Sequence, residues 1–274
     1  MRPREPRLSI NAGTAHGENT TVNGATTLQG WVETPLSIFS KHASLVIMPS
    51  VDLYTLPLSP PCRAVLLTAK ALDVDVNEIL CDPRTGETRT PEFLKMNPCH
   101  QIPTMKDGNL VIGESRAIMM YLANKYGEKC LGLYPNCPEE RAVVDNLLFF
   151  DMGLTSRYTG FYRPIIFGDA KAIDDSAKAS TQEGLELLEA LLTSRGGPWA
   201  AGEKMTIADH ALIASVSSIH VHKKYFNFDK LPKVQEWMKL CETKMKDYSI
   251  ANGPGLKDYE EFQLASFAKK LGGN

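Results

Sequence analysis

The sequence predicts a small α/β domain followed by an all-helical domain, and two observations support this fold class. From residue 51 to about residue 126, short β-prone runs alternate with amphipathic helical segments in the order β-α-β-α-β-β-α. After Tyr126 the β-prone runs stop, and apolar residues repeat only at helical spacing. The length of 274 residues is sufficient for two domains of modest size.

The first strand and the first helix are joined by a turn that contains serine and proline. VDLYT at residues 51–55 is a β-prone run, and SPPC follows at residues 59–62. Ser59 is predicted to cap the helix, and the two prolines occupy its first positions, where a missing N–H costs nothing. The helix itself is indicated by apolar residues at helical spacing, namely Val65, Leu66, Ala69 and Leu72.

Local signals predict the remaining elements of the α/β domain. DVNEIL at residues 75–80 is the second strand, and TPEFLKM at residues 90–96 is a short helix. IPTMKDGNLVI at residues 102–112 is a hairpin, because two apolar runs flank an Asp-Gly pair, which is a strong turn signal. A further helix is predicted to begin at Ser115 and to be capped by it.

Start and stop signals mark the helices of the second domain. A linker rich in glycine and proline precedes Pro138, which opens the first of these helices. Another helix ends at the Gly-Gly-Pro sequence of residues 196–198. Thr206 and Asp209 form a variant of the capping box with aspartate in the place of glutamate, and Pro232 opens one more helix.

Residues 1–47 differ in composition from the rest of the chain. They are small, polar and aperiodic, which is typical of a disordered extension. Arginines with many serines and threonines suit an organelle transit peptide, whereas the glutamates argue against one, because such peptides are poor in acids. The favoured interpretation is that the natural chain starts at Met48 and that the upstream residues are incidental.

Charge and composition exclude several classes of function. The net charge of -2 gives no basic face for nucleic acid, and no apolar run reaches the roughly 18 residues of a membrane helix. None of the 6 cysteines forms a Cys-x-x-Cys pair, so free thiols in a cytoplasmic protein are expected. We expect no metal site, because the His220-x-His222 sequence has no further ligands and is interpreted as a solvated helix end.

The Ser59 turn raises the question of what a hydroxyl does at a helix N-terminus. Free N–H groups and a partial positive charge at such a terminus stabilise an anion. With a serine at its first position, the turn has no dithiol redox pair, but the hydroxyl can donate a hydrogen bond to a thiolate that a ligand brings. A free thiol has a pKa near 8.5, which a helix N-terminus lowers. A plain helix cap is the alternative role of Ser59.

Two further segments could bind other parts of a ligand that brings a thiol to Ser59, namely its peptide backbone and one of its ends. A cis bond at Ile102-Pro103, beside the first helix, would leave the Ile102 N–H and C=O free to pair with an extended peptide. Ser115 can hold a carboxylate and Glu114 can accept from an ammonium group. An edge-strand proline and ordinary helix caps are the structural alternatives. A thiol, an extended backbone and an α-amino-acid end together describe glutathione.

Five segments together resemble a cytosolic glutathione transferase, with a likeness to the insect delta and epsilon classes. They are LPLSPPCRAVLLTAKAL, PEFLKMNPCHQIPTM, LVIGESRAIMMYLANKYG, FFDMG and MTIADHALIAS. The likeness covers about residues 49–265 and implies a homodimer. It also implies a thioredoxin-like, glutathione-binding domain at residues 48–128 and an all-α domain at residues 138–274 that forms most of the electrophile site.

The resemblance implies a role for each residue of the expected site. Ser59 would activate the glutathione thiol, and Asp151 matches an acid near the dimer interface of similar proteins. Thr88 stands where related delta enzymes often carry a histidine, which removes one possible contact to the glycine end of glutathione. The other residues that the resemblance places around glutathione are His100 at the glycine end, Ile102 and Pro103 at the cysteinyl backbone, and Glu114, Ser115 and Arg116 at the γ-glutamyl end.

The expected reaction is conjugation of glutathione, as co-substrate and without a metal, to small hydrophobic electrophiles in detoxification. Xenobiotic conjugation, lipid-aldehyde clearance and dehydrohalogenation all stay open. The alternatives are a non-catalytic protein that binds glutathione or hydrophobic ligands, and a disulfide reductase acting through Cys62, which is expected to be buried. The electrophile pocket is expected between the domains, and its candidate walls, for which ordinary helix core is the alternative, are Leu56, Leu58, Tyr158, Phe161, Tyr162, Phe167 and Phe262.

Overall fold

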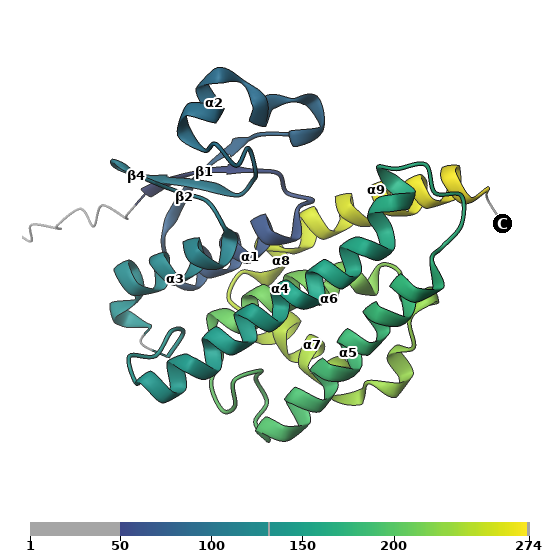
Figure 1. The fold of residues 1–274 in the computed structure, drawn as a ribbon. Coiled ribbons are helices and arrows are strands. Elements are labelled where there is room, and N and C mark those ends of the chain that lie inside the picture. Colours follow the sequence, from purple (N-terminus) through teal and green to yellow (C-terminus); the bar gives the residue numbers. More distant parts are fainter. Residues whose placement is uncertain (1–49, 131, 273–274) are drawn as a thin grey trace, which may run out of the picture. The chain divides into compact units, whose positions relative to one another are not determined.

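The computed structural model describes residues 50–130 and 132–272, so the predicted extension at residues 1–47 lies outside the described part. It confirms the predicted order of a thioredoxin-like α/β domain and a helical domain (Figure 1). The strands are β1 (Ser50–Thr55), β2 (Asp75–Leu80), β3 (Thr104–Asp107) and β4 (Leu110–Ile112). The α-helices are α1 (Pro60–Ala71), α2 (Pro91–Met96), α3 (Ser115–Tyr126), α4 (Pro138–Ile166), α5 (Asp175–Arg195), α6 (Ile207–His220), α7 (Pro232–Lys244), α8 (Tyr248–Ala251) and α9 (Gly253–Leu271).

The four strands form one mixed sheet in the order β2-β1-β3-β4. β1 and β2 are parallel, with α1 as the crossover between them, whereas β3 pairs antiparallel with both β1 and β4. Leu53 of β1 lies opposite Met105 of β3, and both side chains are fully buried. α1 and α3 cover one face of the sheet and α2 lies on the other (Figure 1). The central strand β1 therefore leads directly to the Ser59 turn.

The turn and cap signals of the sequence are confirmed in several places. Thr90 caps α2 by accepting a hydrogen bond of 3.3 Å from the Phe93 N–H. Gly108 has a positive φ of 59° in the turn between β3 and β4, and Gly196 ends α5 in the left-handed conformation. These positions could be predicted from the sequence because each turn or cap residue determines the backbone conformation only of its near neighbours in the chain.

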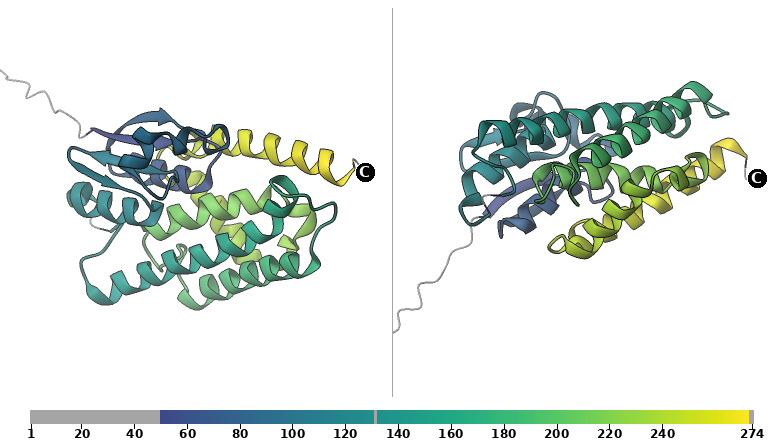
Figure 2. Two further views of the ribbon diagram at one scale, coloured as in Figure 1. Left: turned by 45° about the horizontal axis from the view of Figure 1, so that its top comes forward. Right: turned by 90° about the horizontal axis from the view of Figure 1, so that it is seen from below.

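The helical domain is built around α6, whose residues from Ile207 to Ile219 are all buried. α4 packs against α5, α6 and α9, and α1 of the first domain packs against α6. α9, drawn in yellow near the C-terminal end in Figure 2, contacts α4 and α6. Since α1 and α4 contact the same helix, the two domains share one continuous apolar core. None of the helices in the described ranges is long and apolar enough to cross a lipid bilayer.

Two local predictions are wrong. Ser115 is the first residue of α3, whereas the preceding Glu114 occupies the cap position with a positive φ of 61°. His222 is not at a solvated helix end: it is fully buried, with its Nδ1 2.7 Å from the hydroxyl oxygen of Tyr158. The reason is that α6 ends inside the protein, because the aromatic side chain of Phe267 from α9 covers the His222 ring at 4.3 Å between centroids.

Two buried histidines make the stability of the fold sensitive to acid. Burial lowers the pKa of His210 and of His222 to about 4. Because these values lie below the unfolded value of about 6.5, the unfolded chain binds more protons in this window. The stabilisation is fully present above pH 6.5 and is lost as the pH falls toward 4.

We therefore expect the free energy of urea unfolding to fall by about 2 kcal/mol per histidine between pH 7 and pH 5. His222→Gln keeps a hydrogen-bonding partner for Tyr158 but has no titrating ring, so its unfolding free energy should depend less steeply on pH. Equal pH dependence in the wild type and in His222→Gln would contradict this assignment.

Candidate active site

A cavity of about 610 Å³ opens between the α/β domain and the helical domain. Its walls come from the turn between β1 and α1, the segment before β3, the start of α3, and the helices α4, α6 and α9. Every residue that the sequence analysis assigned to glutathione lines this one cavity. These residues are Ser59, His100, Ile102, Pro103, Glu114, Ser115 and Arg116.

Ser59 occupies the cap position of α1, as predicted, but its hydroxyl makes no capping hydrogen bond. Pro60 and Pro61 have no N–H to offer, and the N–H groups of Cys62 and Arg63 donate to the Ser59 carbonyl oxygen at 3.1 Å each. The hydroxyl is therefore not needed to close the helix, and Ser59 lines the cavity at the positive end of a 12-residue helix.

Cys62 lies one turn from Ser59 but does not line the cavity. Its side chain is fully buried, and burial raises the pKa of its thiol. A thiolate is therefore disfavoured at Cys62, which argues against its use as a redox nucleophile.

The segment before β3 brings His100, Ile102 and Pro103 to the cavity. His100 has a positive φ of 46°, and the peptide bond between Ile102 and Pro103 is cis. Within the described residues, the backbone N–H and C=O of Ile102 make no hydrogen bond to the protein. An extended peptide in the cavity would find both groups available.

The start of α3 supplies Glu114, Ser115 and Arg116. The Arg116 guanidinium forms an ion pair with the buried carboxylate of Asp151 from α4, and it also lies 3.4 Å from the Thr155 hydroxyl. Asp151 thus anchors α3 to α4 and fixes the direction of the arginine. Among the described residues that line the cavity, Glu114 supplies the one acidic group.

The helical wall of the cavity combines aromatic with polar side chains. Leu56 and Leu58 line it from the first domain, and Tyr158, Tyr162, Phe167 and Phe262 line it from α4, the residue after α4, and α9. The rings of Phe167 and Phe262 lie 6.3 Å apart between centroids. Phe161 is the exception among the predicted wall residues: its ring is buried against Phe226 and Phe267, at 5.0 Å and 5.8 Å, and does not line the cavity.

Comparison with known proteins identifies the architecture. The glutathione S-transferase N-terminal domain model matches residues 49–124, and the C-terminal domain model matches residues 162–261. Glutathione S-transferase D7 of Drosophila melanogaster is 40% identical over 199 residues, which cover 70% of this chain and 84% of that protein. The chain belongs to the glutathione S-transferase family.

Solved structures of both insect classes superpose on this transferase. A delta-class glutathione transferase of Nilaparvata lugens has a TM-score of 0.75 and 38% identity, covering 79% of this chain and 99% of that chain. An epsilon-class glutathione S-transferase of the housefly, Musca domestica, has a TM-score of 0.72 and 32% identity, covering 79% of this chain and 98% of that chain. The resemblance noted in the sequence is thus confirmed at the level of fold and family.

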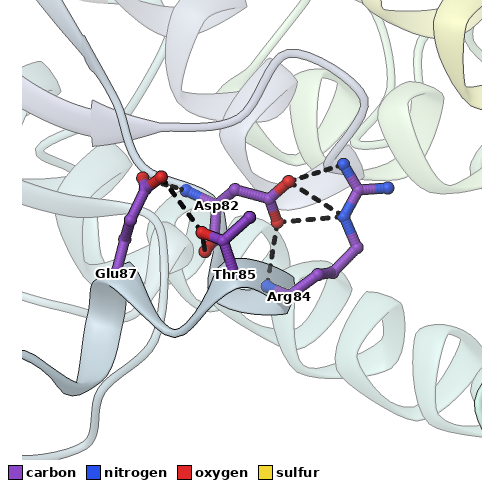
Figure 3. Close-up of polar contacts among 4 residues, drawn as sticks. All are labelled: Asp82, Arg84, Thr85 and Glu87. Atoms are coloured by element: carbon purple, nitrogen blue, oxygen red, sulfur yellow. Dashed lines mark hydrogen bonds and ion pairs between the residues drawn. The ribbon is translucent and has the colours of Figure 1, made fainter.

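One part of the transferase cavity, at Arg84, was not predicted. The Asp82 carboxylate accepts hydrogen bonds from Nη2 of Arg84 at 2.6 Å and from its Nε at 2.9 and 3.0 Å (Figure 3). The Glu87 carboxylate in turn accepts a hydrogen bond from the Asp82 N–H. The Arg84 guanidinium lies 5.0 Å from the centroid of the Phe262 ring. This turn of the first domain therefore contacts α9 at the aromatic end of the cavity, and no local sequence signal indicates that contact.

Asn97 was also missed, although it shapes the loop that brings His100 to the cavity. Its side-chain amide donates to the Thr104 hydroxyl at 2.7 Å and to the Gln101 carbonyl at 3.3 Å, and its Oδ1 accepts from the Cys99 N–H at 3.0 Å. These bonds span the loop that carries His100. An asparagine after a short helix is a usable signal for such a loop, because its side chain bonds readily to nearby backbone groups.

No group of three or more His, Cys, Asp or Glu side chains in residues 50–130 and 132–272 is arranged to hold a metal ion.

Proposed function

We propose that this transferase conjugates the thiolate of glutathione to small hydrophobic electrophiles, with Ser59 as the residue that stabilises the thiolate. The observation that carries this proposal is the Ser59 hydroxyl, which lines the cavity at the N-terminus of α1 without capping the helix. His100, the Ile102 backbone and the start of α3 lie around the same cavity, as the three parts of glutathione require.

The Ser59 hydroxyl donates a hydrogen bond to the sulfur and so lowers the pKa of the bound thiol. The thiolate uses its electron pair to form a bond to the electrophilic carbon. In a substitution the leaving group departs with its bonding pair. In an addition to a conjugated carbonyl the α-carbon takes up a proton from water, to which the glutathione thiol has lost its own. Ser59 forms no covalent bond in either case and acts by charge stabilisation, while the cavity positions the two reactants.

The glutathione contacts follow the order of the cavity wall. His100 binds the glycine carboxylate, and the Ile102 N–H and C=O pair with the cysteinyl backbone beside Pro103. Glu114 accepts from the γ-glutamyl ammonium group, and Ser115 holds the γ-glutamyl carboxylate near Arg116. The side chain of Thr88 is buried and gives the glycine end no second contact.

The aromatic wall of α4 and α9 receives the electrophile. Its lining of leucine, tyrosine and phenylalanine suits an apolar substrate, and it fits xenobiotics, lipid aldehydes and halogenated compounds alike. We place this detoxifying activity in the cytoplasm, where thiols stay reduced; the cysteines of the described residues are all free. We assign residues 48–128 to the glutathione-binding domain and residues 138–274 to the domain that supplies most of the electrophile site.

The test is conjugation of glutathione to a simple aryl halide, followed by absorbance, with glutathione binding measured by calorimetry on the same protein. We expect saturable turnover together with binding. Tight binding of glutathione without turnover on a panel of aryl halides, conjugated aldehydes and alkyl halides would contradict catalysis. That outcome would favour the carrier function, which family membership and the retained site disfavour.

We also propose that the transferase is a homodimer that pairs through α4. Phe149 and Met152 of this helix expose 67% and 44% of their surface, beside the buried Asp151. Large exposed apolar side chains at adjacent turns are typical of an interface between subunits.

Phe149→Glu is expected to convert a species of about twice the chain mass of 30.3 kDa into a monomer, as measured by light scattering. Leu187→Glu, which changes an equally apolar and 45% exposed residue on α5, should leave the mass unchanged. A monomeric wild type, or equal effects of both substitutions, would contradict the α4 interface.

A further inference from the structure

Arg63 lies fully buried behind the cavity wall, and its guanidinium donates four hydrogen bonds. Its Nη1 donates to the Leu58 carbonyl at 2.8 Å, and its Nε donates to Asn252 Oδ1 at 2.8 Å. Its Nη2 donates to the Ser218 hydroxyl at 2.6 Å and to the Ala214 carbonyl at 3.4 Å. A single side chain of α1 thus ties the Ser59 turn to α6 and to the junction of α8 and α9.

None of these four acceptors carries a negative charge. Within the described ranges, no carboxylate lies within 4.0 Å of the Arg63 guanidinium. Burial lowers its pKa to about 10, so it remains charged at neutral pH. The titratable groups around it stay protonated and neutral there, since burial raises the pKa of each of them; they are Cys62, Tyr158, Tyr248 and Tyr259.

The positive charge is close to the groups that form the reaction site. The Arg63 guanidinium contacts the carbonyl of Leu58 and the hydroxyl of Ser218, and it lies 5.7 Å from the ring centroid of Tyr259. Leu58, Ser218 and Tyr259 all line the cavity that Ser59 lines. Because little water separates a buried charge from this cavity, its field is weakly screened there and favours a negative charge.

The start of α9 presses against the same turn. A Cβ atom added at Gly255 would lie 2.1 Å from the Pro57 carbonyl oxygen and 3.0 Å from Cδ of Arg63. Any side chain at this position would therefore force the Pro57 backbone or α9 to shift. Gly255 of the helical domain therefore holds Pro57, and Arg63 of α1 holds Leu58 while it is itself bonded to Asn252 and Ser218 of the helical domain.

We propose that Arg63 is a positioning residue of this transferase: it fixes the turn that carries Ser59, and its unpaired buried charge favours the thiolate of bound glutathione. The role of α9 is to hold that arginine and that turn in place. This inference rests on the proposed role of Ser59.

The experiment measures thiolate formation from bound glutathione by ultraviolet absorbance between pH 5 and pH 9, together with kcat. In Arg63→Gln the pKa of the bound thiol should rise by about one unit, so kcat near pH 6.5 should fall about tenfold and recover at pH 9. Arg63→Lys keeps the charge and should retain most of the thiolate. A thiol pKa in folded Arg63→Gln equal to that of the wild type would overturn the proposal.

A second pair of variants keeps the test decisive if Arg63→Gln does not fold. Gly255→Ala should raise the thiol pKa and lower kcat, whereas Gly253→Ala, whose new Cβ would meet nothing within 4 Å, should match the wild type. An unchanged thiol pKa in Gly255→Ala would refute the positioning role of α9. Ser59→Ala separates the two proposals: if it leaves the thiol pKa unchanged, the role of Ser59 fails, and if it alone raises that pKa, the role of Arg63 fails.

Discussion

Replacing Ser59 with alanine is expected to lower kcat for glutathione conjugation about 30- to 100-fold near pH 7. A hydrogen bond to a charged group contributes about 1.5–3 kcal/mol, and here it acts on the thiolate that attacks the electrophile. The affinity for glutathione should change less than about threefold, because in the proposed binding mode the loop of His100 and the start of α3 make most of the contacts to the tripeptide. Steady-state kinetics with an aryl halide and calorimetry on the same preparation check both values.

The pH profile gives this prediction a second observable. A free thiol has a pKa near 8.5, so the Ser59→Ala variant should gain rate up to about pH 9, whereas the wild type should level off at lower pH. The loss of activity should therefore shrink as the pH rises. A constant loss at all pH values would indicate that Ser59 positions glutathione and does not stabilise its thiolate.

Cys62→Ala is the matched control for Ser59→Ala, since it changes the other polar side chain of the same turn. Cys62 is buried away from the cavity, and the pKa of its thiol is raised by burial. We expect Cys62→Ala to keep kcat within about threefold of the wild type, with a small loss of stability from the lost packing. A large loss of activity in Cys62→Ala with normal activity in Ser59→Ala would instead support thiol chemistry at Cys62.

The features predicted correctly from the sequence are those that a short stretch of chain determines. The capping box at Thr206, the turn at Gly108 and the start of α4 at Pro138 each depend on a few neighbouring residues. The binding roles assigned to the glutathione residues stay a prediction, and the structure adds that these residues line one cavity.

The features that were missed or misassigned depend on contacts between distant segments. The pattern of α4 does not show that Phe161 faces Phe267 instead of the cavity, since the packing of α9 decides which face is buried. Arg84 contacts the ring of Phe262, although the two residues are far apart in the sequence. Arg63 would be interpreted as a solvated residue from its charge alone, and only the assembled α6 and α9 explain its burial. Helical periodicity shows that a residue is on a face, but not which partner covers that face.

The largest loss of stability is expected from Asp209→Ala. The Asp209 carboxylate is fully buried and accepts from the N–H groups of Ala200 and Thr206 at 2.8 Å each, and from Nε1 of Trp237 at 2.9 Å. It also contacts the Thr206 hydroxyl at 3.2 Å. This one side chain joins the loop before α6, the first turn of α6 and α7, so its removal leaves several buried donors without a partner.

We expect Asp209→Ala to lower the free energy of unfolding by about 3–5 kcal/mol, because each buried donor left unsatisfied costs about 1–3 kcal/mol. In a chain of this size that corresponds to a fall in Tm of about 10 °C, measured by thermal unfolding with Trp237 as a fluorescent reporter. Asp174→Ala is the matched control: Asp174 caps α5 at the surface by accepting from Ser176 and Ala177, so its loss should cost only about 1 kcal/mol. If the two substitutions lower Tm equally, Asp209 acts as an ordinary helix cap. The hydrogen bonds by which it links α6 to α7 would then add nothing to the stability.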